Sequence, residues 1–263
     1  MSRARRRLVL GAAAVLAGVV VVAAGCGAWV SGSGDLVTRD VDVGGVTRVE
    51  AGSSFTVTVA YGQSAAATIT IDDNLVEFLE ADVSGDTLRV GMEPGNAFTD
   101  ETLKLAVTLP ELRAVDLSGA SEGRVQGFAS DAPLEIVLSG ASNLELADVR
   151  AGRTTVDASG ASRLTGRLQA GGASFDLSGA SKAVLAGAGG AVNIDASGAS
   201  DVALGAFVVT AARAGHSGAS HATVNVSGRL DVDLSGASGL RYIGQPRMGD
   251  IKTTGASSIE RGD

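Results

Sequence analysis

Apolar and polar residues alternate with a period of two through the section between residues 41 and 110. Side chains two positions apart lie on one face of an extended strand, so the alternation predicts strands with one buried face. Segment 72–83 departs from it and predicts a short helical turn, capped by Asp72 or Asp73, that brings Leu75, Phe78 and Leu79 together. The section is therefore predicted to be mostly β. Its expected buried residues are Phe55, Val57, Val59, Ile69, Ile71, Leu88, Val90, Leu103, Leu105, Val107 and Leu109.

A four-residue motif, Ser-Gly-Ala-Ser, recurs eight times between residues 111 and 263, once with threonine in first place. Successive copies lie 18 to 21 residues apart, and a short period kept over many copies is typical of a solenoid. The sequence therefore predicts an all-β fold: a parallel β-solenoid, similar to a right-handed β-helix, with about 19–20 residues per coil. The handedness itself is not determined by the sequence. The first hydroxyl residues of the copies are Ser118, Ser139, Ser159, Ser178, Ser197, Ser217, Ser235 and Thr254.

Each copy carries mostly apolar residues one and three positions before its first hydroxyl, with aspartate between them in five of the eight copies. This predicts one strand per coil with one face in the core. The apolar pattern restarts after the motif, which is therefore expected at a corner between two short strands. Glycine supplies backbone angles that other residues resist, and alanine is expected to fill the inside of the corner. The serine hydroxyls are expected to bond nearby backbone groups or their counterparts one coil away.

The first 25 residues have the layout of an export signal. Four arginines precede an uncharged apolar run, which ends in Ala23-Ala24-Gly25 directly before Cys26. This arrangement resembles a bacterial lipoprotein signal, which implies cleavage before Cys26, a lipid on its thiol, and anchoring on the outer face of the cytoplasmic membrane or the cell surface. An uncleaved anchor helix and ordinary signal cleavage are the alternatives. Residues 26–40 are small and polar and predict a flexible tether.

Composition narrows the function further. Cys26 is the only cysteine, so neither a disulfide within the chain nor a cysteine-based metal site is available. The formal net charge is −8, and loss of the four signal arginines leaves about −12 on the exported part. So acidic a domain would repel phosphates, which excludes nucleic acid as a partner.

Residues 44 to 258 resemble the putative auto-transporter adhesin head GIN domain family of bacterial envelope proteins. The stretches that carry the resemblance are GVTRVEAGSSFTVTVAYG, LKLAVTLPELRAVDLSGAS and the later Ser-Gly-Ala-Ser coils, in that order. The resemblance implies one parallel β-solenoid domain over residues 41–263, exported and often lipid-anchored. It brings no catalytic residues and no cofactor.

Aspartates recur at one outward position of the coils, and Asp157, Asp176 and Asp195 fall in three consecutive coils. Hard cations such as Ca²⁺ bind several carboxylate oxygens, so these three residues are a candidate metal site. A solvated acidic stripe that discourages aggregation is the favoured alternative. The full set of aspartates in this column is Asp116, Asp157, Asp176, Asp195 and Asp233.

A second outward column, four positions after each first hydroxyl, varies in chemistry while its neighbours are constant. Solenoids use one face for partners, so this column is a candidate partner-binding face, with ordinary surface variation as the alternative. The two histidines are five apart and predicted to face opposite ways, His216 as a hydrogen-bonded substitute for a core residue in an irregular coil. The column residues are Glu122, Asn143, Arg163, Lys182, Asp201 and His221.

These observations favour a non-enzymatic, lipid-anchored module, adhesin-like or binding an envelope protein or a glycan. Two alternatives stay open. One is a polysaccharide-active enzyme, for which the aspartate column with Arg163 and Lys182 nearby is the only candidate site. The other is an accessory or sensor protein of an envelope-response system. The ligand and the oligomeric state are not determined by the sequence.

Overall fold

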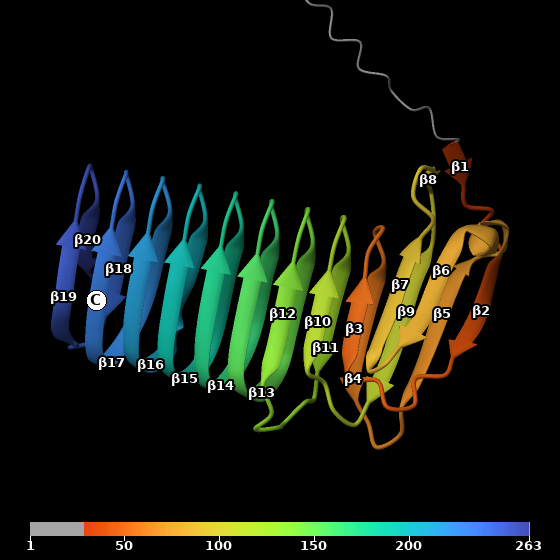
Figure 1. Ribbon diagram of the computed structural model, residues 1–263, viewed down its shortest axis with the longest axis horizontal. Coiled ribbons are helices and arrows are strands. Elements are labelled where there is room, and N and C mark those ends of the chain that lie inside the picture. Colours follow the sequence, from red (N-terminus) through yellow and green to blue (C-terminus); the bar gives the residue numbers. More distant parts are fainter. Residues whose placement is uncertain (1–28, 263) are drawn as a thin grey trace, which may run out of the picture.

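The computed structural model describes residues 29–262, which form a parallel β-solenoid with its strands stacked along one axis (Figure 1). Eighteen strands make one continuous sheet that winds round the core, and β1 and β8 make a separate two-stranded sheet. The solenoid fold and the β-rich N-terminal section predicted from the sequence are confirmed. The elements of the N-terminal section are β1 (Trp29–Ser31), β2 (Leu36–Val41), β3 (Arg48–Ala51), β4 (Thr56–Tyr61), β5 (Ala66–Asp72), the 3₁₀ helix η1 (Asp73–Phe78), β6 (Leu79–Ser84), β7 (Thr87–Met92), β8 (Ala97–Thr99) and β9 (Leu103–Leu109).

The repeat section differs from the prediction in the length of its strands. Each strand β13 to β17 runs for 14 to 16 residues from one Ser-Gly-Ala-Ser turn to the next. The two short strands expected on either side of a turn are thus joined by a bend at the opposite edge. The elements are β10 (Ala114–Leu117), β11 (Glu122–Gln126), β12 (Leu134–Leu138), β13 (Asn143–Ala158), β14 (Arg163–Leu177), β15 (Lys182–Ala196), β16 (Asp201–His216), β17 (His221–Leu234), β18 (Gly239–Ile243), β19 (Arg247–Thr253) and β20 (Ser258–Arg261).

The coils begin earlier than the motif does. Strands β3 and β4 stack in parallel on β10 and β11 and form a coil of their own. Its turn contains Ser53 and Ser54, both with positive φ (58° and 66°), in place of the motif glycine. Strands β7 and β9 form the next layer below β3 and β4. The motif is absent from these layers, so the change of pattern near residue 110 marks no structural boundary.

The Ser-Gly-Ala-Ser turns explain why the motif is repeated. Gly160 has φ +72°, and a Cβ on it would lie 2.3 Å from the carbonyl oxygen of Gly140 in the coil below, so only glycine fits. The alanine N–H donates to the glycine carbonyl of that coil, as from Ala161 to Gly140 at 2.7 Å. Equivalent corner residues of successive coils are thus joined by backbone hydrogen bonds.

The second serine of the motif fills the inside of the corner. The sequence predicted alanine there, and that prediction is wrong. Ser162 is buried and its hydroxyl donates to the carbonyl of Ser159 at 2.8 Å. Ala161 lies on the outside and is exposed. A hydroxyl suits the inside because the tight turn leaves a buried carbonyl that needs a donor.

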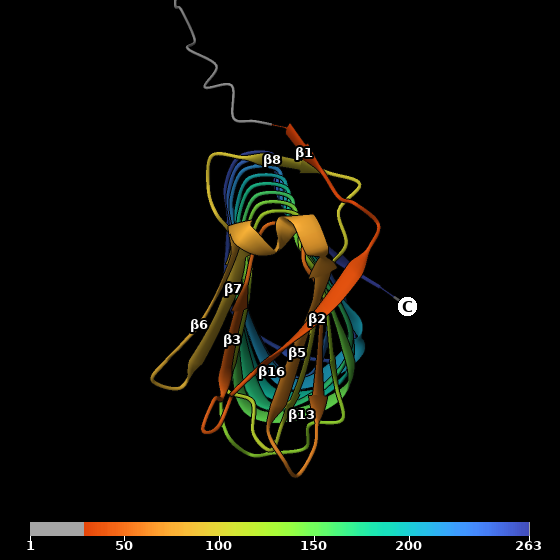
Figure 2. The ribbon, with the colours of Figure 1, turned by 90° about the vertical axis from the view of Figure 1, so that its right-hand side faces the viewer.

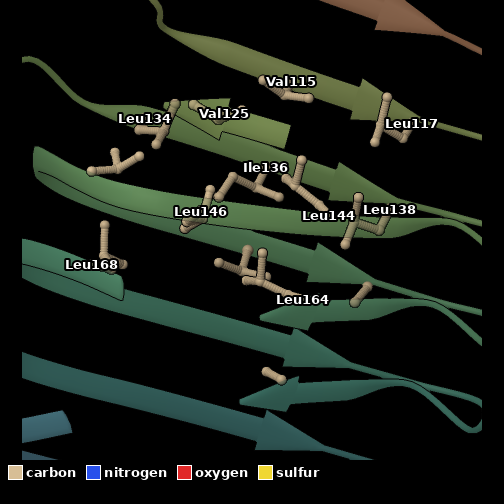
Figure 3. Packing of buried hydrophobic residues seen from close by; sticks show 14 of the residues in the cluster. Val115, Leu117, Val125, Leu134, Ile136, Leu138, Leu144, Leu146, Leu164 and Leu168 are labelled. Carbon is tan, nitrogen blue, oxygen red and sulfur yellow. The ribbon is translucent and has the colours of Figure 1, made fainter. Parts of the chain in front are cut away.

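The core lies between the two sheet layers and is filled from both sides. Figure 3 shows Val115, Ile136 and Leu138 from the strands before the turns beside Leu144 and Leu164 from the strands after them. All five are at most 2 % exposed. The period-two alternation therefore placed the core residues correctly in both halves of a coil.

Residues 29–40 do not form the flexible tether that their composition predicted. Strand β1 pairs in parallel with β8, and β2 pairs antiparallel with β5. The buried carboxylate of Asp72 accepts the N–H groups of Gly34 and Thr102, each at 2.7 Å. Asp72 occupies the N-cap position of η1, as predicted, but its side chain makes no capping hydrogen bond there. The predicted signal, Cys26 and the rest of the tether lie outside the described residues.

The coil of His216 is irregular, as the sequence predicts, but His216 itself occupies a regular position in the core. Residues 211–216 pair in unbroken register with β17. The register shifts lie on the other half of the coil, between Leu204 and Val208 and between Val209 and Ala211.

Among residues 29–262 no helix is long and apolar enough to cross a membrane.

Candidate functional site

Two candidate surfaces lie on opposite sides of the solenoid, as the view along its axis shows (Figure 2). We call the outer surface of the strand segments before the turns the aspartate face, and that of the segments after the turns the varied face. Parallel pairing holds equivalent residues of successive coils side by side, about 4.8 Å apart. Each face therefore presents straight columns of side chains.

The aspartate face carries the predicted column in one register. Asp157 pairs with Asp176, and Asp176 with Asp195. Burial, followed by the charges of Asp176 and Glu135, raises the pKa of Asp157 above its usual value. A raised carboxyl pKa means that the ionised form is disfavoured there. Nevertheless, within residues 29–262 no three His, Cys, Asp or Glu side chains converge as a metal site.

The N-terminal end of the aspartate face is hollowed into a groove that the sequence did not indicate. Its volume is about 430 Å³, and Glu50, Glu80, Asp82, Arg89 and Asp116 line it. Arg89 forms an ion pair with Glu50 at 2.7 Å. Burial, and then the charges of Glu50 and Glu135, raise the pKa of Asp116. The only sequence signal for this groove is the alternation of β6 and β7, which does not reveal that β7 stacks beside β3.

The varied face brings together all six residues predicted for it. Strand pairing aligns Glu122 with Asn143, and the register continues coil by coil to His221. Lys182 and Asp201 form an ion pair at 2.6 Å, both half-buried. Arg163 is exposed and has no ion pair within the described part of the chain. The centre of the column is therefore a free guanidinium beside a neutralised lysine.

The proposed partners of an enzymatic site are not brought together. Asp157 and Asp176 project from the aspartate face, whereas Arg163 and Lys182 belong to the varied face beyond the intervening turn. A polysaccharide-cleaving site requires its acid and its base to flank one bond. The prediction that these cations lie near the acidic column is wrong, because the turn reverses the chain between them.

The two histidines face opposite ways, as predicted. His216 is 3 % exposed, and neither of its ring nitrogens has a hydrogen-bond partner in the described part of the chain, so the predicted hydrogen bond is wrong. Burial, with a smaller contribution from the charge of His221, lowers the pKa of His216 to about 4. His216 is therefore neutral at pH 7 and replaces the leucine or alanine of the other coils in volume only.

Comparison with known proteins agrees with this architecture. The family model described as "Putative auto-transporter adhesin, head GIN domain" matches residues 45–246. Similar solved structures include a putative lipid binding protein from Parabacteroides distasonis, with 17% identity, a TM-score of 0.82, and coverage of 89% of this chain and 100% of that one. A putative adhesin from Parabacteroides merdae has 17% identity, a TM-score of 0.82, and coverage of 90% and 100%. A putative adhesin from Bacteroides fragilis has 18% identity, a TM-score of 0.66, and coverage of 88% and 99%. No curated protein matches the chain.

Proposed function

Because the chain belongs to the family of putative auto-transporter adhesins with a head GIN domain, we propose that it is a non-enzymatic, adhesin-like binding module. In this proposal the module is exported, held at the membrane by a lipid on Cys26, and binds an envelope protein, a glycan or another extracellular partner. The solenoid is the frame, and one of its faces is the binding surface.

The varied face is the observation that carries the proposal. Its residues change from acidic to amide to basic and back while the turns and core positions beside them stay constant. From Glu122 to His221 the column spans five coil steps of about 4.8 Å, on the order of 24 Å. A rigid row of different side chains at fixed spacing can distinguish partners by charge pattern.

The arrangement of charged groups supports a binding role over catalysis. The acids of the candidate enzymatic site, Asp157, Asp176 and Asp195, lie on the aspartate face, whereas its two bases lie on the varied face beyond the turn. Acid–base work on one bond requires both groups within hydrogen-bond reach of it. Asp157, Asp176 and Asp195 lie side by side in one row, whereas a glycosidase places its two carboxyl groups on either side of the bond that it cleaves.

The test is a binding measurement with charge reversal on each face. The chain from residue 27 onward would be labelled and titrated onto a glycan array and onto intact bacterial and host cells. Arg163→Glu with Lys182→Glu reverses the varied face. Arg153→Glu with Arg213→Glu is the matched control, because both arginines lie on segments before the turns and the charge change is the same.

We expect saturable binding that the varied-face pair weakens at least about tenfold, which corresponds to ~1.4 kcal/mol. The control pair should leave the dissociation constant within about twofold. Absence of saturable binding to any probe, or equal loss from both pairs, would contradict the proposal. Release of reducing sugar ends from a bound glycan would favour the enzymatic alternative.

A further inference from the structure

The small sheet of β1 and β8 stands apart from the rest of the solenoid in its chemistry. In a chain with 19% charged residues, segments 29–34 and 94–99 contain none. Trp29, the only tryptophan, is 78% exposed at the outer end of β1. Its register partner on β8 is Ala97. The chain thus presents a bare indole on two uncharged segments, which Asp35, Glu93 and Asp100 flank.

This tip is held firmly on the solenoid. Val30 and Phe98 pack against the core, and the Phe98 ring lies 5.6 Å from that of Phe78. Asn74 of η1 donates to the Ser31 carbonyl at 2.9 Å and accepts from the Ser33 N–H at 3.0 Å. Trp29 therefore projects from a fixed support, and its exposure is a property of the fold.

The position of Cys26 in the sequence indicates what covers the indole. Only residues 27 and 28 separate Trp29 from Cys26, so a lipid on Cys26 brings the membrane within about 7–11 Å of extended chain from β1. Tryptophan is enriched at membrane–water interfaces, where the ring lies among the headgroups and its N–H stays hydrated. A second copy or a glycan would not be delivered to this position by the anchor.

The distribution of charge also favours the approach of this edge of the molecule to a membrane. In both views β1 and β8 lie on the side of the molecule where the Ser-Gly-Ala-Ser turns lie (Figures 1 and 2), and those turns are uncharged. The columns of acidic side chains lie on the two sheet faces. A strongly acidic chain meets the least repulsion from anionic lipid when its uncharged edge approaches the surface.

We propose that the β1–β8 tip is a membrane-docking surface, with Trp29 inserted at the lipid–water interface beside the anchor. This inference rests on the lipid anchor of the proposed function. In the docked orientation neither sheet face is turned toward the membrane surface, so both faces are accessible to partners.

The single tryptophan makes a direct test available. The full-length chain would be produced in a lipidating bacterium, purified, and reconstituted into phosphatidylcholine–phosphatidylglycerol vesicles with brominated acyl chains. Mass spectrometry would establish the lipid on Cys26, and tryptophan emission would be read with and without bromine. The control is Trp29→Phe with Tyr61→Trp, because Tyr61 is 53% exposed at the end of β4 that lies away from the turns.

We expect Trp29 emission to shift to the blue in vesicles and to lose most of its intensity with brominated lipid, while the control variant shows neither change. Lipid on Cys26 with unshifted and unquenched Trp29 would overturn this inference and leave the anchor in place. Quenching of the Tyr61→Trp control to the same degree would also overturn it. Absence of lipid on Cys26 would overturn the anchor and this inference together.

Discussion

The two ends of the solenoid are built from the same kind of coil but differ in what covers them. At the N-terminal end, β2 crosses the opening and β5 pairs antiparallel with both β2 and β9 (Figure 2). Ile71 and Leu75 there are fully buried. In the last coil, β19 and β20 each pair on one side only within residues 29–262. Ile251 is consequently 42% exposed, whereas its counterpart Val232 is 3% exposed.

The difference shows that the repeat specifies a coil, and that the next coil determines whether its apolar residues are buried. The last coil keeps the turn, with Ala256 donating to the Gly236 carbonyl at 2.7 Å. In a solenoid each repeat contacts only its neighbours, so stability is a sum of coil and interface contributions. The same residue position should therefore have different energetic weight in the interior and at the open end.

The largest expected effect is a cavity in the interior. Phe175→Ala removes a fully buried ring from β14 and should lower the free energy of unfolding by about 4 kcal/mol. Ile251→Ala occupies the same column at the open end and should cost less than about 1 kcal/mol. Urea denaturation of both variants measures this. Equal losses would show that the last coil is as well packed as the interior.

The next effect concerns His216, a polar residue in an interior position. Its pKa is about 4 when folded and 6.5 in the unfolded chain, so the unfolded state binds more protons between these values and stability falls as pH decreases through that window. The loss reaches about 3 kcal/mol at most. His216→Leu should be more stable at pH 7 and lose this acid sensitivity. Denaturation of the native chain and of His216→Leu at pH 7, 5.5 and 4 tests this prediction. The same pH dependence of stability in both proteins would contradict it.

A smaller loss of stability is expected from substitutions in the turns. It differs between a Ser-Gly-Ala-Ser turn that stacks on another such turn and the first one, which stacks on the turn of Ser53 in the N-terminal section. In Gly160→Ala the new Cβ meets a backbone oxygen at 2.3 Å, and we expect a loss of about 2 kcal/mol. In Gly119→Ala the nearest atom is the Ser53 nitrogen at 3.1 Å, which a small shift relieves, so the positive φ is the main cost, about 1 kcal/mol. Thermal unfolding of both variants compares them. A greater loss from Gly119→Ala would mean that close stacking is not what excludes Cβ.

The smallest effect is expected on the aspartate face. Replacing Asp157, Asp176 and Asp195 together by Asn removes repulsion between partly exposed carboxylates and should raise stability by less than about 1 kcal/mol. Unfolding of the native chain should be the same in calcium and in EDTA. A large rise in melting temperature with calcium, lost in the Asn variant, would instead establish a metal site.

The sequence predicted the repeat part of the fold well because its signal is local and repeated. Apolar residues at period two and a glycine turn at constant spacing leave one arrangement, and the column from Glu122 to His221 followed from the register. The coil of β3 and β4 was missed because its turn contains Ser53 and Ser54 at positive φ, which sequence statistics assign to glycine. Asp72 was misread because its partners, Gly34 and Thr102, are distant in sequence.

The candidate site was only partly predictable for a similar reason. Composition identifies which positions vary, but the separation of Asp157 from Arg163 depends on the turn between them reversing the chain. The groove beside Glu50 and Arg89 depends on β7 lying against β3. The exposed position of Trp29 depends on pairing of β1 with β8, about 70 residues away.

Hydrogen–deuterium exchange along the chain tests most directly whether each coil is protected by the coil stacked on it. The interior strands β13 to β16 should exchange slowest and at similar rates, because each is paired on both sides. Strands β19 and β20 should exchange fastest although their turn has the same motif. Equal protection of β19, β20 and the interior strands would contradict this account of the solenoid.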